Sequence, residues 1–335
     1  MTELDTESIS DKLNLSSYHK AVEAATHYYQ PDTAYLRITG PDRMQFLQRQ
    51  TTNDLSRLLP GHILTTVLTS PTARILDVLI LLIEQRDPDV ISIITLPGYS
   101  SKTRQFLQSR IFFMDKVTIQ DTSTDFEQID LIGPAWKHLI PNLGIDHLPI
   151  EDNIQYGQIG STPVRAFNHF GLGIRLLFPS SGESDVIAAL ARSGSEEISS
   201  EIYGVLRVEA GVPSPAHELT EDYTPLEAGL EKAISTEKGC YTGQEVLARQ
   251  ITYNKVTRQL VGLRLTNQSF GEPTLRSPED HKNVGEITSV AHSPRNGYIA
   301  LGMVKQPYYQ PGTRLIVGDP QEGHFATVSA LPFTS

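Results

Sequence analysis

The sequence contains only one cysteine, Cys240, among its 335 residues. A single cysteine excludes an intrachain disulfide and is typical of proteins in a reducing compartment. It also excludes an iron–sulfur cluster held by this chain alone, because such clusters generally need several thiolates. None of the ten histidines stands at metal-ligand spacing with another ligand, so we predict no metal site.

Long apolar runs and an excess of basic residues are also missing. The longest apolar run, residues 78–83, is far too short to span a membrane. The chain has 28 Lys and Arg against 39 Asp and Glu, which gives a net charge of −11. This charge argues against broad binding to nucleic acids or anionic membranes, although a local basic patch is compatible with it.

The N-terminal residues 1–14 lack targeting features. They are acidic and polar, without the basic start and apolar stretch of a signal peptide or the Arg-rich character of a transit peptide. We therefore expect a cytoplasmic protein without a membrane partner.

The residues that are present fit an ordinary soluble globular protein of two or three domains, with 39% hydrophobic and 20% charged residues. The first part of the chain alternates strands and helices. The pattern predicts a helix at 18–29, a strand at 34–38, a helix after Pro41, a hairpin within 62–84, a strand at 90–96, a helix at 98–109 and a strand at 112–120. This order indicates an α+β unit.

The second part of the chain ends in short strands. A second hairpin is expected at 163–167 and 171–177, followed by a helix at 184–192 capped by Ser184 and a helix at 198–209. The last of these helices has a clear end, because Gly211 and Pro213 follow it. After residue 249, short strands separated by Gly, Pro, Asn and Asp predict a small β-barrel.

The most informative stretch is KGCYTGQE, residues 238–245. Gly239 and Gly243 bracket Cys240, and glycines at this spacing indicate a tight turn. A helix is predicted to start at Gln244. A cysteine just before a helix N-terminus, with Lys238 nearby, is expected to favour the thiolate and to be reactive. The alternative is that Cys240 is a small buried apolar residue, as most lone cysteines are.

Three carboxylates occupy informative positions. Glu209 lies in the last turn of a predicted helix, at the negative end of the helix dipole, where cations are favoured. Such a position without compensation indicates function, and the alternative is a solvated glutamate. Asp77 lies in a predicted strand, where a carboxylate usually points to solvent or protects an edge. Asp54 is predicted to cap a turn, and HELTED, residues 217–222, to form a solvated face.

The motifs RVEAG (207–211), PLEAGL (225–230) and KGCYTGQE together resemble the YgfZ-type folate-binding proteins. These proteins are relatives of the glycine cleavage T-protein and include a mitochondrial factor for late iron–sulfur cluster assembly. The resemblance implies an α+β, three-domain cloverleaf with folate in a central channel. Its domains would be a discontinuous folate-binding domain at 1–60 and 145–245, an inserted ferredoxin-like domain at 61–144 and a C-terminal β-barrel at 246–335.

The resemblance also implies site residues. Glu209, with Arg207 of the same motif, would hold the pterin ring of tetrahydrofolate or a derivative, because a carboxylate can accept from the amino group and adjacent N–H of that ring. Cys240 would be the reactive thiol, and Asp77 is the second catalytic candidate. The other residues expected to bind the cofactor are Lys238, Gly239, Tyr241, Gly243, Gln244 and Glu245.

The implied function is a folate-binding accessory factor for assembly or repair of iron–sulfur clusters in client enzymes, including tRNA-modifying enzymes. Its partners would be these clients or assembly factors, without direct contact to nucleic acid, and it would not be a classical enzyme. The alternative is a tetrahydrofolate-dependent aminomethyltransferase. T-protein relatives carry two aspartates at this point of the chain, one implicated in aminomethyl transfer, whereas here Asp77 is followed by Val78. A third alternative is an interaction module with a vestigial folate pocket.

Overall fold

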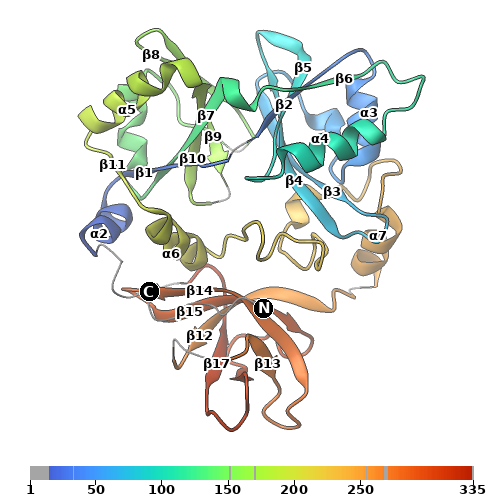
Figure 1. Cartoon of the computed structure of the whole chain (residues 1–335), viewed down its shortest axis with the longest axis vertical. Helices are drawn as coiled ribbons and strands as arrows, with labels where there is room; N and C mark the ends of the chain where they lie inside the picture. Colours follow the sequence, from blue (N-terminus) through green and yellow to red (C-terminus); the bar gives the residue numbers. More distant parts are fainter. Residues whose placement is uncertain are drawn as a thin grey trace.

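Two open β-sheets and one closed barrel make up the protein (Figure 1). The computed structural model describes residues 15–32, 34–150, 152–169, 171–253, 255–267 and 271–333. The two sheets lie side by side at the top of Figure 1, and the barrel lies below them. Helix α6 (Ser200–Ala210) and the loop after it run between the sheets and the barrel. The α+β fold with a C-terminal barrel is confirmed.

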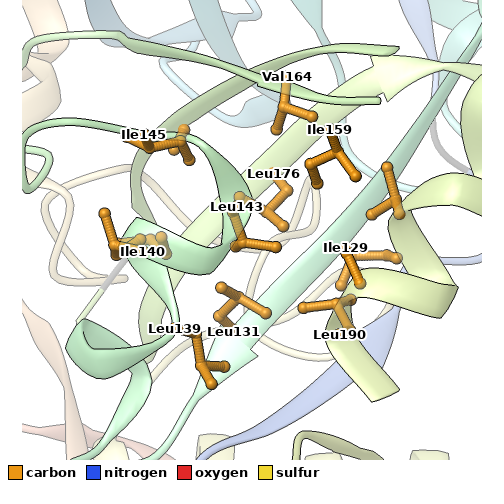
Figure 2. Packing of buried hydrophobic residues seen from close by; sticks show 14 of the residues in the cluster. Ile129, Leu131, Leu139, Ile140, Leu143, Ile145, Ile159, Val164, Leu176 and Leu190 are labelled. Atoms are coloured by element: carbon orange, nitrogen blue, oxygen red, sulfur yellow. The ribbon is translucent and has the colours of Figure 1, made fainter. Parts of the chain in front are cut away.

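The first sheet has six strands in the order β11-β1-β7-β10-β9-β8. Its strands are β1 (Thr26–Tyr29), β7 (Phe126–Ile132), β8 (Gln155–Ile159), β9 (Thr162–His169), β10 (Gly173–Pro179) and β11 (Glu196–Glu197). Helix α5 (Glu183–Arg192) covers one face, and Figure 2 shows Leu190 of this helix beside Ile129 and Leu131 of β7. Alternate apolar residues of the strands therefore form a core under the helix.

The second sheet has five strands in the order β3-β4-β5-β2-β6. Its strands are β2 (Tyr35–Thr39), β3 (His62–Thr69), β4 (Ile75–Glu84), β5 (Asp87–Ile94) and β6 (Thr118–Asp121). Helices α3 (Arg43–Gln50) and α4 (Ser100–Ser109) bury Phe46, Leu47 and Leu107 against this sheet. The predicted hairpin within 62–84 is confirmed as the β3–β4 pair.

The barrel closes in the order β12-β15-β14-β13-β16-β17. Its strands are β12 (Arg258–Leu265), β13 (Thr274–Arg276), β14 (Asn283–Ser293), β15 (Gly297–Lys305), β16 (Arg314–Val317) and β17 (Phe325–Ser329). The remaining α-helices of the described residues are α2 (Leu15–Glu23) and α7 (Gln244–Thr252). Short 3₁₀ turns are η2 (Leu55–Arg57), η3 (Ser123–Asp125), η4 (Trp136–His138), η5 (Ile140–Leu143), η6 (Ser180–Gly182) and η7 (Glu231–Ala233).

Three local predictions are wrong. The helix expected at 18–29 ends at Glu23, because residues 26–29 form β1 and pair with β7. The strand expected at 112–120 begins only at Thr118, and Phe113 before it is exposed. Ser184 does not cap α5, whose N-cap is Gly182 without a side-chain hydrogen bond.

The strand pairing also crosses the expected domain boundaries. Strand β2 (35–39) pairs with β5 and β6 and therefore belongs to the sheet of residues 35–121, not to the segment 1–60. Strand β7 (126–132) pairs with β1 and β10, although 61–144 was expected to form the inserted unit. The five-stranded sheet thus interrupts the six-stranded one between β1 and β7. The division into a discontinuous folate-binding domain and an inserted domain stays a prediction.

Candidate functional site

A cavity of about 430 Å³ lies between the two sheets and α6. On one side its wall consists of apolar residues of β4 and β5 and the residues after β5, namely Val78, Ile80, Ile94 and Leu96. On the other side, Tyr203, Gly204 and Arg207 of α6 line it, together with the loop 212–219. This volume and an apolar lining with few polar groups are typical of small-molecule sites. We call it the central cavity.

A buried charged cluster supports the inner wall of the central cavity. Arg175 of β10 donates from Nε and Nη2 to the two carboxylate oxygens of Asp130 on β7, over 2.7 and 2.9 Å. Gln30 and Tyr203 donate to Asp130 Oδ2 over 2.6 and 3.2 Å. Burial acts to raise the pKa of Asp130, but the charge of Arg175 and the hydrogen bonds from Arg175 and Gln30 together help to hold this pKa below its usual range. Asp130 and Arg175 therefore form an ion pair in which both carboxylate oxygens of Asp130 accept hydrogen bonds.

His169 completes this cluster as a neutral group. Burial, and then the charge of Arg175, lower the pKa of His169 to about 3. Its Nε2 lies 2.7 Å from Arg175 Nη2 and accepts from it, because a guanidinium can only donate. Gln30, His169, Arg175 and Tyr203 all line the central cavity. The cluster thus offers a rigid polar end to an otherwise apolar cavity.

The rings of Tyr28 and Tyr203 are stacked beside the cavity, with centroids 4.1 Å apart and planes 19° apart. Tyr203 is held at its hydroxyl by Asp130. A flat aromatic surface opposite the aliphatic wall of Val78 and Ile94 suits a planar heterocycle, since stacking and apolar contact both depend on flat faces.

Asp77 and Val78, neighbours on β4, point to opposite faces of the sheet. Val78 lines the central cavity, whereas Asp77 is fully buried on the other side. Asp77 accepts a hydrogen bond from Leu96 N over 3.1 Å and another from the hydroxyl of Thr103 on α4. Burial raises the pKa of Asp77 to about 7. The prediction that this carboxylate points to solvent is wrong, and the position facing the cavity carries an aliphatic side chain.

Glu209 lies outside the central cavity, in a smaller recess between α6, α2 and the barrel. Its Oε1 accepts from Tyr18 Oη over 2.6 Å and from the hydroxyl of Ser293, and its Oε2 accepts from Arg295 Nη2 over 2.8 Å. The expectation of a carboxylate without compensation at the helix end is therefore wrong. Three donors from α2 and the barrel offset the unfavourable dipole, so that position alone no longer indicates a pterin contact.

Arg207 does line the central cavity, as part of a second buried network that sequence reasoning missed. Its Nη2 donates to Ser289 Oγ over 2.9 Å, and its Nη1 lies 3.5 Å from Glu218 Oε2. Glu218 is fully buried and accepts from Thr288 and Ser289 of the barrel, each over 2.6 Å. The HELTED segment is thus not a solvated face at Glu218. This carboxylate joins the cavity loop to the barrel.

The KGCYTGQE segment does not line the central cavity. Lys238 is buried and donates from Nζ to the carbonyls of Gln48, Thr51 and Asn53, over 2.8, 2.7 and 2.6 Å. Burial lowers the pKa of Lys238 to about 8, against the opposing charge of Asp54. Its ammonium therefore binds the end of α3 and the following turn. The expectation that it serves the thiol of Cys240 is not supported by these contacts.

The turn around Cys240 is fixed at Gly243. This residue has φ of 84°, and an added Cβ would lie 2.8 Å from Ser70 O, so only glycine fits. The hydroxyl of Thr69 donates to Thr242 O over 2.6 Å and ties the turn to the end of β3. Gly239 is different, because nothing lies within 4 Å of its added Cβ. Cys240 is exposed, which rules out the buried alternative.

The other residues of this segment that were expected to bind the cofactor do not line the central cavity either. Gln244 and Glu245 form the first turn of α7, where Glu245 is exposed. Tyr241 packs with Ala73, Leu226 and Leu247. Asp54 is confirmed as a cap, since its side chain accepts from Ser56 N. Of the predicted cofactor residues, only Arg207 is thus placed on the wall of the central cavity.

Comparison with known proteins identifies the family. Residues 16–238 match the GCVT N-terminal domain, and residues 258–334 match the glycine cleavage T-protein C-terminal barrel domain. The chain belongs to the glycine cleavage T-protein family. Both T-protein regions coincide with the two-sheet part and the barrel of the structure.

Individual relatives agree with this membership. A chloroplastic protein of Arabidopsis thaliana that carries the name "Putative transferase" is 31% identical over 304 residues, covering 89% of this chain and 68% of the relative. An aminomethyltransferase of Chlorobium luteolum is 28% identical, covering 94% and 89%. The crystal structure of the glycine cleavage system aminomethyltransferase T from Bartonella henselae superposes with a TM-score of 0.83 at 20% identity, covering 96% and 89%. The superposition on the Bartonella henselae structure shows that the two proteins share a fold.

The T-protein fold explains why sequence reasoning missed the Asp130–Arg175 pair. Asp130 stands between Ile129 and Leu131, and Arg175 between Ile174 and Leu176, so each is one charge in an apolar strand. The two residues are direct cross-strand partners. A single charge in each of two apolar strands indicates that each charge needs a buried partner. The sequences of β7 and β10 do not show, however, that these two strands are neighbours.

In the described ranges, no helix is long and apolar enough to cross a membrane. The same part of the chain holds no group of three or more His, Cys, Asp and Glu side chains arranged for a metal ion.

Proposed function

We propose that this T-protein family member binds tetrahydrofolate or a derivative in the central cavity. Members of the family use tetrahydrofolate as substrate or cofactor. The main support for this proposal is the cavity, whose volume of about 430 Å³ lies between the aliphatic wall at Val78 and the aromatic ring of Tyr203. The flat pterin ring would lie between these two faces.

Polar groups of the cavity would orient the bound folate. Arg175 and Arg207 both bring positive charge to the lining, and each is paired with a buried carboxylate. Ser214 also lines the cavity, and its hydroxyl is buried without a hydrogen-bond partner among the described residues. Since an unpaired buried hydroxyl costs free energy, a ligand that pairs with it is favoured. These residues, rather than Glu209, are our candidates for pterin contacts.

We further propose that the folate-bound protein acts in the cytoplasm as an accessory factor. It would assist the assembly or repair of iron–sulfur clusters in client enzymes, including tRNA-modifying enzymes. Support comes from the resemblance of KGCYTGQE to the YgfZ-type proteins and from the exposure of Cys240 on a turn fixed by Gly243. Because Cys240 does not line the central cavity, folate and a client could be bound together.

Aminomethyl transfer is the second candidate, and the names of the relatives favour it. Several relatives at 25–28% identity are aminomethyltransferases. The wall of the central cavity opposes it, because Val78 faces the ligand where a second aspartate is expected in the enzymes, and Asp77 points away. Geometry thus supports folate binding without this transfer.

Gly204 provides the test of folate binding. It lies within α6, lines the cavity, and nothing lies within 4 Å of its added Cβ. Gly204→Trp should fill the cavity and abolish the heat of tetrahydrofolate binding in calorimetry. Gly204→Ala is the matched control, since it should keep binding and stabilise the helix by about 0.5–1 kcal/mol. Equal affinity of the Trp variant and wild type would remove folate from this cavity.

The choice between the two candidates needs a separate assay. Wild-type protein is incubated with tetrahydrofolate and an aminomethyl-loaded carrier protein, and release of ammonia and methylenetetrahydrofolate is followed. We expect no turnover. Turnover approaching ~10 per second, typical of enzymes, would establish aminomethyl transfer instead.

A further inference from the structure

A second recess, of about 540 Å³, lies between the β3–β4 turn, α7 and the start of the barrel. It is lined by Thr72, Arg74, Thr224, Glu227, Val246, Gln250, Thr257, Arg258, Lys305 and Gln306. We propose that this recess binds a phosphate dianion, either free or as part of a phosphorylated metabolite. We call it the basic recess.

The charge of the basic recess is opposite to that of the protein. Its lining carries the cations of Arg74, Arg258 and Lys305 against the single carboxylate of Glu227, although the whole chain has a net charge of −11. The excess of two positive charges matches a phosphate group, which carries between one and two negative charges at pH 7. A local positive excess in an acidic protein attracts and retains such an anion.

Glu227 holds the two guanidinium groups in place. Its carboxylate is 2% exposed and accepts from Arg258 Nε over 3.0 Å, and it lies 3.5 Å from Arg74 Nη1. Both arginines also donate to Asp222 O over 2.8 Å. Among the described residues, the printed contacts engage Nη1 of Arg74 and Nε and Nη2 of Arg258. Each guanidinium has five N–H donors, so both arginines keep further donors that an oxyanion could accept from.

The barrel places two of these cations side by side. Arg258 of β12 and Lys305 of β15 are direct cross-strand partners. Like charges at directly opposite positions destabilise a β-sheet. Glu227 contacts Arg258, whereas Lys305 Nζ donates to the carbonyl of Asn283 over 3.1 Å. A bound anion between the two cations would relieve this repulsion.

Neutral polar side chains line the same recess. Thr72, Thr224 and Thr257 contribute to it, and the Thr257 hydroxyl donates to Glu227 Oε1 over 3.4 Å. Gln250 of α7 also lines it, and its Oε1 is buried without a hydrogen-bond partner in the described part of the chain.

The basic recess is separate from the central cavity, and the two share no lining residue. One apolar cluster lies beside both of them. It contains Leu219, which lines the central cavity, and Ile75 and Tyr223, which are chain neighbours of Arg74 and Thr224 in the basic recess. Val246 and Gln250 come from α7, the helix that follows the Cys240 turn. An anion here would join α7 to the barrel and fix the position of that turn. This inference does not depend on folate binding.

The test is calorimetry of the full chain with inorganic phosphate at constant ionic strength, with chloride as the reference salt. We expect saturable binding and a melting temperature that rises with phosphate, because a ligand of the folded state stabilises it. Arg74→Gln and Lys305→Gln should each weaken binding about tenfold by removing a charged donor. Lys137→Gln removes one charge from an exposed residue outside the recess and should bind as wild type.

Adenosine diphosphate is titrated in a second arm. Tighter binding than inorganic phosphate identifies a phosphorylated metabolite as the ligand, and equal binding identifies the free ion, so either result supports the site. Absence of saturable binding of both ligands to wild type would overturn the proposal. So would equal affinities in Arg74→Gln, Lys305→Gln and Lys137→Gln, since the anion would then bind elsewhere.

Discussion

Arg175 and Asp130 form a bidentate ion pair between β10 and β7, and both side chains are buried. Each residue is the direct cross-strand partner of the other. Their strands come from parts of the chain more than forty residues apart, and Tyr203 of α6 binds the same carboxylate. The pair therefore fixes the position of α6 against the six-stranded sheet, at the wall of the central cavity.

Asp130→Asn should destabilise the protein by about 3–5 kcal/mol, because Arg175 then stays buried and charged without a partner. The double variant Asp130→Leu with Arg175→Met should lose less, since it removes both charges together. Urea unfolding measures both free energies. A loss below about 1 kcal/mol in Asp130→Asn would show that the pair is not held as an ion pair.

Much of the fold could be predicted from local patterns, and the failures have a common cause. The β3–β4 hairpin and the barrel follow from alternation and turn residues that lie close together in the sequence. The prediction of a helix over residues 26–29 is wrong because their strand depends on pairing with β7, about a hundred residues away, and with β11, which lies farther still. Local propensity carries no information about such partners.

The site was harder to predict for the same reason. The local sequence makes Glu209 look uncompensated and Lys238 look activating, but the partners of both residues come from distant segments. Arg295 is 86 residues from Glu209, and Thr51 is 187 residues from Lys238. The tight turn at Gly243 is predicted correctly, because a positive φ is a local requirement that glycine meets.

Asp77 should make stability depend on pH. Its folded pKa is about 7, raised by burial from 3.8. Between these values the folded state binds a proton that the unfolded state has released, so the stability contributed by Asp77 is present below about pH 4 and lost as pH rises through 7. The slope approaches ~1.4 kcal/mol per pH unit. Urea unfolding at pH 5 and pH 7 measures this difference.

Asp77→Asn removes the titrating group while keeping its shape. Relative to wild type, this variant should gain stability as the pH rises from 5 to 7. Asp146→Asn is the control, because Asp146 is exposed. If Asp77→Asn and Asp146→Asn show the same dependence on pH, the carboxylate of Asp77 is ionised in the folded state throughout this range.

Glu209→Gln should affect stability first. The change replaces an acceptor of three hydrogen bonds, from Tyr18, Ser293 and Arg295, by an uncharged group that also donates. Loss of the charge-assisted bond should cost about 1.5–3 kcal/mol in urea unfolding. The tetrahydrofolate dissociation constant of this variant separates two roles. An unchanged constant agrees with a structural Glu209, and a weakened one would restore the pterin contact that the resemblance implies.

Cys240 should be needed for function and not for stability. It is exposed, so Cys240→Ala leaves no buried cavity, and the free energy of unfolding should stay within ~0.5 kcal/mol of wild type. Iodoacetamide should modify native wild-type protein without unfolding it, because the thiol is exposed. The Ala variant provides the blank, because it has no other cysteine.

The functional part of this prediction needs a cellular assay. In a strain that lacks the gene, wild type should restore the activity of iron–sulfur enzymes, whereas Cys240→Ala should not. Gly239→Ala is the matched control, since an added Cβ at Gly239 meets nothing within 4 Å and leaves the thiol in place. Full complementation by Cys240→Ala would show that the thiol is not the working group. The role of the segment would then lie in the Gly243 turn and in the anchoring of α3 by Lys238.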